Sequence, residues 1–307
     1  MMTHVDPTAE GSGADTTVGG GSRLLRAVGS NRLLWLGAAI IALSILIAVF
    51  GPLVAPYDPI AVELPDRLLP PGPDHILGTD QLGRDVLSRI LHAGRVTISI
   101  ASAAVLLSAV IGITIGIASG YVGGKVDMVL QRIVDVQLAF PTILLAITLV
   151  AVLGTSVPVL IFVFLVAGWV RYVRVIRAQT LVLRETQFIE AARAMGGSTP
   201  HILRYYVAPN LLTEMIVLVN LEVARIVLLE SGLSYLGLGV QPPLPTWGNM
   251  LSDGRLYLTS GWWAATFPGL AIMIVVLGVN LFAEGLRSVY DPRVRKLRAV
   301  ELEEAGV

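Results

Sequence analysis

Four charged side chains stand within an otherwise apolar stretch, residues 211–232, and they are the residues of this sequence best suited to chemistry. Drawn as an α-helix, the stretch places Glu214, Glu222, Arg225 and Glu230 within about 160° of arc. Each charge left in lipid costs about 2.5–3.5 kcal/mol, so this face is expected to meet protein or water. Glu222, Arg225 and Glu230 are therefore candidates for lining a path for charged solutes. The other interpretation is an internal Glu222–Arg225 pair that neutralises itself against neighbouring helices.

Residue types that catalyse reactions or hold metals do not gather elsewhere in the sequence. The absence of cysteine removes thiol nucleophiles, disulfides and thiolate metal sites. The four histidines are scattered without ligand spacing, at His4, His75, His92 and His201. A phosphate-binding loop needs Gly, four residues, Gly-Lys and then Ser or Thr. Lys125 has Ser119 in place of the first glycine, and Lys296 follows Arg295. We expect no catalytic residue, no metal and no cofactor in this chain, which disfavours a membrane-embedded enzyme.

The composition is that of an integral membrane protein. Hydrophobic residues make up 54% of the 307 residues, charged residues only 14%, and the mean hydropathy is +0.75, whereas soluble domains carry about 25% charged residues. The net charge of zero provides no attraction for nucleic acid. The expected surroundings are membrane lipid, and no nucleic-acid partner is expected.

Six segments are long enough to cross a bilayer, which takes about 20 helical residues. They cover residues 33–50, 96–118, 136–153, 154–170, 211–232 and 262–283. The third carries Pro141, which a membrane helix tolerates when its neighbours satisfy the freed carbonyl. The fifth is the charged segment, on which hydropathy alone is indecisive. The sequence predicts an all-α membrane protein with six transmembrane helices.

The distribution of positive charge predicts the orientation of these spans. In a six-span arrangement, one side receives 16 Lys and Arg residues and the other receives 5. The positive-inside rule then places both termini in the cytoplasm. Omitting the fifth span would move the C-terminal cluster around Arg293 and Lys296 outside, so charge favours six spans.

This arrangement divides the chain into four parts. Residues 1–22 are too poor in apolar side chains to fold alone and are expected to form a disordered cytoplasmic tail. Residues 23–95 contain the first transmembrane helix and an extracytoplasmic segment. Residues 96–290 form a five-helix core that includes a cytoplasmic loop at 180–210. Residues 291–307 form a cytoplasmic C-terminal tail.

The loop at 180–210 contains an unusual polar stretch, EAARAMGGSTPHILRYYVAPN, which starts at Glu190. Apolar residues recur at helical spacing before and within it, at Phe188, Ala191, Ala192 and Met195. They predict a short amphipathic helix over residues 187–195, ended by Gly196-Gly197. Ser198 or Thr199, followed by Pro200, predicts the start of another helix.

A short helix in a cytoplasmic loop is suited to insertion into a groove on another protein. The small alanines allow close approach, and Glu190 offers a carboxylate to a partner's cation. The alternative is a helix lying on lipid headgroups, which favours bulkier apolar residues and a lysine-rich rim. This loop has no lysine.

The same loop resembles the signature of permease subunits of bacterial ATP-binding-cassette importers. The positions that match the pattern are Glu190, Ala191, Ala192, Gly196, Pro209 and Asn210, whereas Tyr206 stands where many peptide permeases have His and Ala208 replaces the usual Leu. Two further stretches look like hallmarks of the dipeptide and oligopeptide permease C subunit. They are HILGTDQLGRDVLSRILHAGRVTISIA at 75–101 and LLESGLSYLGLGVQPPLPTWGNML at 228–251. The resemblance extends over about residues 30–295.

The residues of these two stretches also have structural interpretations. In the first, Asp85 and Arg89 are spaced to pair at i, i+4, beside an apolar stripe that includes Val86 and Ile90. This pattern predicts a helix lying against the outer membrane surface. The second is a Gly- and Pro-rich turn with Trp247 at an interface.

The resemblance implies a type I importer permease fold with a coupling helix between spans 4 and 5. That helix would dock into a partner ATPase through Glu190, Ala191, Ala192, Met195, Gly196, Pro209 and Asn210. The implied partners are a second permease subunit, two ATPase domains that bind ATP and Mg, an external substrate-binding protein and a peptide substrate. The implied location is the bacterial cytoplasmic membrane.

Two alternatives remain open at this point. The same class of importer also carries nickel chelates and other small solutes. An ion-coupled secondary transporter is more remote, because its case depends only on the charges of the fifth segment and no internal repeat is evident.

Overall fold

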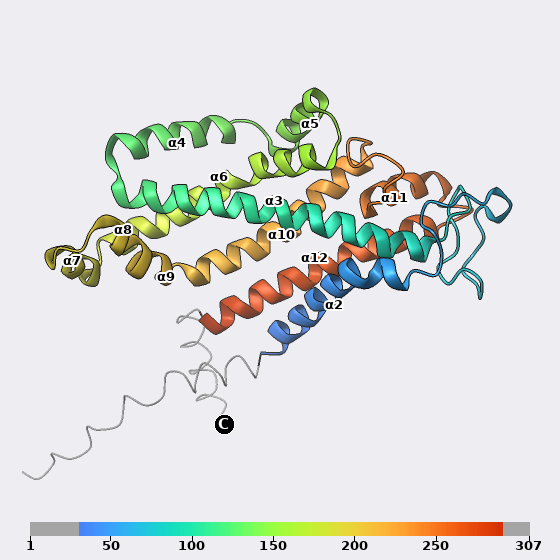
Figure 1. The fold of residues 1–307 in the computed structure, drawn as a ribbon, viewed down its shortest axis with the longest axis horizontal. Helices are drawn as coiled ribbons and strands as arrows, with labels where there is room; N and C mark the ends of the chain where they lie inside the picture. The colour runs from blue at the N-terminus through green and yellow to red at the C-terminus, as the bar shows by residue number, and fades with distance from the viewer. Residues whose placement is uncertain (1–30, 291–307) are drawn as a thin grey trace, which may run out of the picture.

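The computed structural model describes residues 31–290, and the regular elements within that range are all helical (Figure 1). The α-helices are α2 (Arg32–Val54), α3 (Val86–Val122), α4 (Gly124–Leu138), α5 (Thr142–Leu153), α6 (Val157–Arg184), α7 (Gln187–Ala194), α8 (Thr199–Ile202), α9 (Ala208–Asn210), α10 (Leu212–Tyr235), α11 (Trp247–Gly254) and α12 (Trp263–Tyr290). Three short helices join them: η1 (Leu64–Asp66), the π-helical η2 (Leu203–Val207) and η3 (Arg255–Tyr257). The all-α prediction is confirmed. The tails predicted at 1–22 and 291–307 lie outside the described residues.

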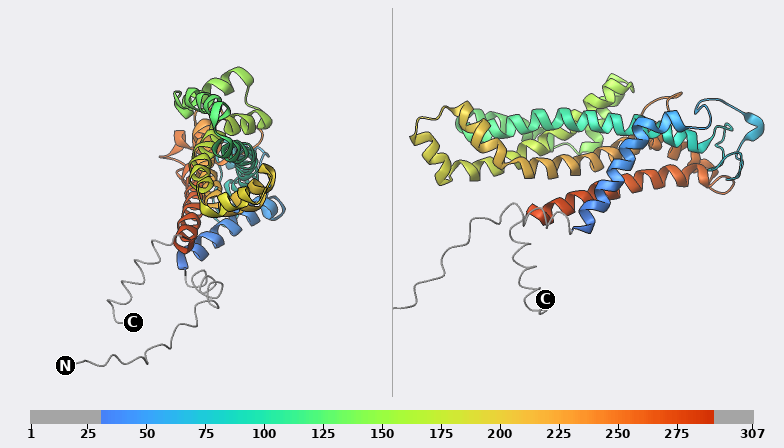
Figure 2. Two further views of the ribbon diagram at one scale, coloured as in Figure 1. Left: turned by 90° about the vertical axis from the view of Figure 1, so that its left-hand side faces the viewer. Right: turned by 60° about the horizontal axis from the view of Figure 1, so that its bottom comes forward.

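The long helices form an elongated bundle. Figures 1 and 2 show α3, α6, α10 and α12 running along its length. The short helices α7, α8 and α9 lie at one end, and residues 55–85 lie with α11 at the other. The main contacts join α3 to α6 and α2 to α12, while α10 packs between α12, α3 and α6. The bundle therefore has two chemically distinct ends, separated by apolar helices.

By length and hydropathy, four helices within residues 31–290 can cross a membrane: α2, α3, α6 and α12. The pair α4 and α5 makes a fifth crossing only if it counts as one broken span, because the two helices meet at 85°. The sequence predicted a continuous helix over 136–153, and this prediction is wrong. Pro141 lacks an N–H and disfavours helical geometry in the residue before it, so α4 ends at Leu138 and α5 begins at Thr142.

The second predicted span is longer than the sequence indicated. The helix expected on the membrane surface at 85–91 is instead the beginning of α3, which continues for 37 residues. Asp85 caps it by accepting a hydrogen bond from the Ser88 amide at 2.7 Å. Gly94 does not interrupt the helix, because the Trp247 ring lies directly against it.

The predicted Asp85–Arg89 pair is also wrong. Arg89 donates instead to the Asp80 carboxylate. Asp85 is occupied by its helix cap and by the His75 ring, whose Nδ1 lies 3.0 Å away. The i, i+4 spacing permitted the pair, but the loop before α3 brings better-placed partners to both side chains.

The fourth span also extends beyond its predicted end at residue 170. Helix α6 reaches Arg184, so residues 171–184 add about four helical turns beyond the predicted end, and the helix includes the start of the predicted loop. Arg177 stabilises this extension by a bidentate pair with Asp127 of α4, at 2.6 Å for each bond. Residues that sequence analysis assigned to a loop thus belong to the rigid bundle.

A glycine stripe sets the close approach of α3 and α6. Gly112, Gly116 and Gly120 recur every fourth residue and face α6. A Cβ atom at Gly112 would lie 2.4 Å from the Trp169 carbonyl oxygen, and one at Gly120 would lie 2.8 Å from the Arg177 carbonyl oxygen. Since backbone atoms cannot move aside locally, this interface requires glycine.

We predict that Gly112→Ala destabilises the protein by about 1–3 kcal/mol, because the added methyl overpacks a backbone contact. The matched control is Gly232→Ala in α10, where a Cβ atom meets nothing within 4 Å and helix propensity favours alanine by about 1 kcal/mol. Thermal unfolding of the purified protein should show a lower midpoint only for Gly112→Ala. Equal midpoints for the two variants would contradict this account of the interface.

Candidate functional site

The short helix α7 forms where the loop pattern predicted it. It spans Gln187–Ala194, with Met195 as its C-cap. Gly196 follows at φ +81°, the left-handed conformation that ends helices without strain for glycine. Helix α8 then begins after Ser198 with Pro200 in its first turn. The helix–turn–helix arrangement follows the sequence closely, whereas the role of α7 stays a prediction.

One face of α7 packs onto the chain itself. Ile189 and Ala192 are buried, at 0% and 3% exposure. They belong to an apolar cluster with Tyr172, Ile176, Ile202, Val207, Leu211, Met215 and Leu218. Ala192, one of the residues predicted to face a partner, lies in this cluster and attaches α7 to α6, α8 and the start of α10.

The face of α7 next to the buried one is exposed and apolar. Met195 is 77% exposed and Phe188 is 43% exposed, with Ala191 between them on the same side. Glu190 is also exposed, and it forms no ion pair within residues 31–290. This stripe, Phe188–Ala191–Met195, has the spacing with which a helix enters an apolar groove.

Two arginines tie the α7 region to the end of α3. The Arg193 guanidinium lies 4.9 Å from the centre of the Tyr121 ring, and its Nε donates to the Tyr121 hydroxyl at 3.1 Å. Arg184, at the end of α6, donates to the Gly120 carbonyl at 3.1 Å. A hollow of about 500 Å³ lies between these contacts. Both contacts join the α7 region to the end of α3.

Pro209 and Asn210 form the junction between the loop and α10. Both are exposed and lie in α9. Pro209 has no N–H to offer the preceding turn, and the π-helical η2 lies directly before α9. The Asn210 side chain donates to the Tyr206 carbonyl at 2.6 Å. These residues shape the entry into α10 and lie apart from the exposed α7 stripe.

Two of the four charged residues of α10, Glu222 and Glu230, are buried, and Glu222 is paired. Glu222 is 1% exposed, and Arg225 Nε donates to its carboxylate at 2.6 Å. Arg225 also donates to the Ala167 carbonyl at 3.2 Å. Arg171 of α6 approaches the other Glu222 oxygen to 3.0 Å, as an ion pair without hydrogen-bond geometry. The internal Glu222–Arg225 pair is thus present, and a second arginine from α6 joins it.

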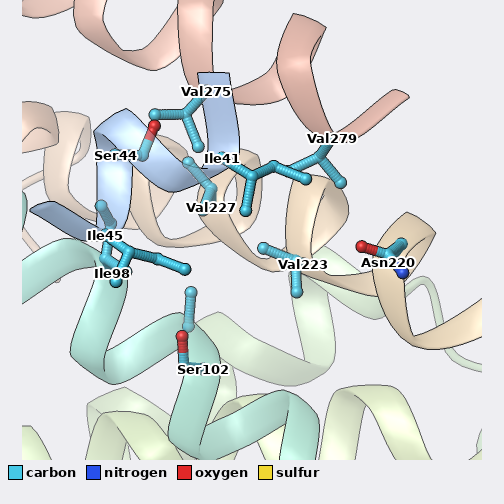
Figure 3. A pocket seen from close by; sticks show the side chains of 11 residues that line it. Ile41, Ser44, Ile45, Ile98, Ser102, Asn220, Val223, Val227, Val275 and Val279 are labelled. Carbon is cyan, nitrogen blue, oxygen red and sulfur yellow. The ribbon is translucent and has the colours of Figure 1, made fainter. Parts of the chain in front are cut away.

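Glu230 lies apart from that ion pair. It is fully buried, and Ser234 donates to its Oε1 at 2.7 Å, while its Oε2 has no hydrogen-bond partner. A separate cavity of about 170 Å³ lies between α2, α3, α10 and α12 (Figure 3). From α10 it is lined by Asn220, Val223 and Val227. Glu222, Arg225 and Glu230 are not among the residues that line this cavity.

Comparisons with known proteins connect this architecture with transport. The model of the binding-protein-dependent transport system inner membrane component matches residues 112–296, and the N-terminal TM domain of oligopeptide transport permease C matches residues 23–71. The chain belongs to this family of transport permeases. It is therefore a membrane component of an ATP-binding-cassette importer rather than an enzyme, and ATP hydrolysis takes place in separate subunits.

The permease is similar to curated relatives over most of its length. The dipeptide transport system permease protein DppC of Alkalihalophilus pseudofirmus is 39% identical over 265 residues, which cover 86% of this chain and 87% of the relative. The oligopeptide transport system permease protein OppC of Bacillus subtilis is 38% identical, covering 87% and 88%. The probable D,D-dipeptide transport system permease protein DdpC of Escherichia coli is 36% identical, covering 89% and 92%. Multi-pass insertion in the inner membrane, with ATPase and substrate-binding partners in general, follows from this membership.

Sequence analysis missed the partners of these residues. Arg171 was assigned to a cytoplasmic loop, yet it lies in α6 and reaches Glu222. Its three-residue spacing from Arg174 was a sign that the helix continued. No pattern in the sequence indicated the contact between Tyr121 and Arg193, because the two residues lie 72 positions apart.

We predict that Arg225→Gln destabilises the permease by about 1–3 kcal/mol, because it removes the hydrogen-bonded partner of a buried carboxylate that then keeps only Arg171. The double variant Glu222→Gln with Arg225→Gln should recover part of this loss, with a coupling energy of about 0.5–3 kcal/mol. Thermal unfolding of the assembled transporter measures both. Arg174→Gln is the control, because Arg174 is 59% exposed and lies 3.8 Å from a half-exposed Asp135. Additive effects at Glu222 and Arg225 would show that the pair contributes nothing.

Proposed function

We propose that this permease moves short peptides across the bacterial cytoplasmic membrane, powered by partner ATPases. The complex would contain a second permease subunit, two ATPase domains that bind ATP and Mg, and an external substrate-binding protein. The printed names of the relatives support a peptide cargo, since they are dipeptide and oligopeptide permeases. Nickel chelates and ion-coupled transport gain no support from these names.

The exposed α7 stripe is the observation that carries the proposal. An apolar stripe on an eight-residue helix, anchored from behind by Ile189 and Ala192, is suited to a groove on an ATPase. The exposed carboxylate of Glu190 would pair with a cation at the rim. Because Arg193 and Arg184 attach this region to α3, closure of the ATPases would pull on the long helices directly.

We infer six crossings in this arrangement: α2, α3, the broken pair α4–α5, α6, α10 and α12. The separation of the two ends of the bundle supports this topology (Figure 1), as does the asymmetry of 16 to 5 positive charges. Helices α7 to α9 and both termini would be cytoplasmic, and residues 55–85 and α11 extracytoplasmic. Helix α10 can cross despite its charges, because Glu222 and Glu230 are buried within the bundle.

The ion pair around Glu222 also suggests the position of the translocation path. The Arg171 side chain is 57% exposed and that of Arg225 is 22% exposed, although Glu222 beside them is buried. A half-exposed arginine facing lipid is unfavourable by several kcal/mol. We therefore place this face of α6 and α10 toward the second permease or the path between the two subunits. Glu230 would support the path from behind, since it is fully buried.

Gly196→Leu is predicted to uncouple ATP hydrolysis from peptide transport. Gly196 lies at the end of α7 and has open space around its Cβ position, so a leucine there would meet the partner rather than this chain. The matched control is Gly124→Leu, which has the same left-handed backbone strain at φ +63° and the same open surroundings. Peptide uptake and peptide-stimulated ATPase activity of reconstituted transporter measure the effect. If both variants lose peptide uptake equally, backbone strain alone would explain the effect of Gly196→Leu.

The topology is tested by cysteines introduced into this cysteine-free chain. Leu256 is 74% exposed at the α11 end, and Met195 is 77% exposed at the α7 end. We predict that an impermeant thiol reagent modifies Leu256→Cys and spares Met195→Cys in intact cells, with both modified after lysis once the partner ATPases are removed from the membrane. Modification of Met195→Cys in intact cells would overturn the orientation.

A further inference from the structure

A polar cavity at the α11 end has no role in the proposed coupling. It measures about 340 Å³ and lies between the loop before α3 and the segment that connects α10 to α11. The side chains that supply hydrogen-bonding groups to its lining are Gln81, Arg84, Arg89, Ser234, Gln241, Asn249, Ser252 and Asp253. Both arginines are buried, at 8% and 4% exposure. Two buried cations on one small cavity indicate an anion site rather than a surface hollow.

One carboxylate holds both arginines in place. Asp80 is 3% exposed, and its Oδ2 accepts from Arg84 Nε at 2.7 Å and from Arg89 Nη1. Its Oδ1 accepts from the backbone amides of Leu82 and Arg84, at 2.8 and 3.1 Å. The Asp80 carboxylate is therefore fully engaged, and it fixes the direction of both guanidinium groups.

The outer nitrogens of the two guanidinium groups remain available. Arg84 Nη2 and Arg89 Nη2 lie 3.7 and 3.8 Å from one oxygen of Asp253, too far for hydrogen bonds. Arg89 Nε, although buried, has no hydrogen-bond partner. The Asp253 side chain is 42% exposed, so it is free to move away. Asp253 thus forms long ion pairs with both guanidinium groups and no hydrogen bond with either.

The two outer nitrogens indicate the kind of ligand. Arg84 Nη2 and Arg89 Nη2 lie 3.7 and 3.8 Å from the same Asp253 oxygen, so they converge on one place. Two converging guanidinium nitrogens suit the two oxygens of a carboxylate. The C-terminus of a peptide has this chemistry.

We propose that this cavity binds a carboxylate through Arg84 Nη2 and Arg89 Nη2, with Asp253 swinging out as the ligand enters. The carboxylate comes either from the C-terminus of the peptide cargo or from an acidic side chain of the external substrate-binding protein. The inference rests on the proposed peptide transport and identifies a docking point for it on the outer side.

The first arm measures binding of dialanine to the complete transporter in lipid nanodiscs, without ATP and without binding protein, by saturation-transfer NMR titration. Dialanine should bind at least about tenfold more tightly than alanyl-alaninamide, which lacks the carboxylate. Asp253→Asn should strengthen dialanine binding several-fold, because it removes the competing negative charge. Asp74→Asn is the control, since it makes the same charge change on an exposed residue outside the cavity lining.

The second arm measures binding of the purified substrate-binding protein to the same nanodiscs. If the carboxylate belongs to that protein, dialanine does not bind alone, and Asp253→Asn strengthens binding of the protein whereas Asp74→Asn does not. Either positive arm supports the site and identifies the source. The inference is overturned if neither arm responds to Asp253→Asn, or if alanyl-alaninamide binds as well as dialanine while the protein arm is unresponsive. Failure of the parental transporter to take up peptides would contradict the proposed function instead.

Discussion

The structure depends on the close approach of α3 and α6. Three glycines spaced by four residues let the α3 backbone lie against α6 carbonyls, where any Cβ atom would overlap a backbone oxygen. In lipid, water does not drive helices together, so close packing must supply much of the attraction. The pair that results is the frame to which the other elements attach.

The α7 region and α4 owe their positions to this frame. Arg177 holds α4 through Asp127, and Arg184 reaches the carbonyl of Gly120, the last glycine of the stripe. Arg193 then attaches α7 to Tyr121, one residue further along α3. These contacts join α6 and α7 to the end of α3. The proposed docking helix is therefore held directly against the long helices.

Several buried carboxylates are tolerated in this apolar chain because neighbouring side chains pair with them or donate hydrogen bonds to them. Glu222 is paired by arginines from two helices, Glu230 accepts from a serine one turn away, and Asp80 organises two arginines by itself. A buried charge without such partners would cost several kcal/mol. The exceptions are Arg171, which stays half exposed, and the free guanidinium nitrogens beside Asp253. These exceptions are where the proposals about path and ligand arise.

The sequence by itself determined the class of protein, the all-helical fold and the detail of the α7 loop. Composition identified the class of protein. The α7 loop could be predicted because the apolar spacing that forms the helix and the glycine that ends it both lie between Phe188 and Gly196. The sequence could not predict which residues of α7 are buried. Ile189 and Ala192 are buried because α6 and α8 pack against them, and this packing leaves no signal within α7 itself.

Only the tertiary structure decided the extents of the long helices and the pairing of the charges. Helices α3 and α6 run past their predicted ends because partners elsewhere in the chain satisfy Arg89 and Arg177, and α4 ends early because Pro141 finds no compensating geometry. The i, i+3 pair of Glu222 and Arg225 was visible in the sequence. Its third member, Arg171, was not, because 51 positions separate it from Glu222 and only the packing of α6 on α10 brings them together.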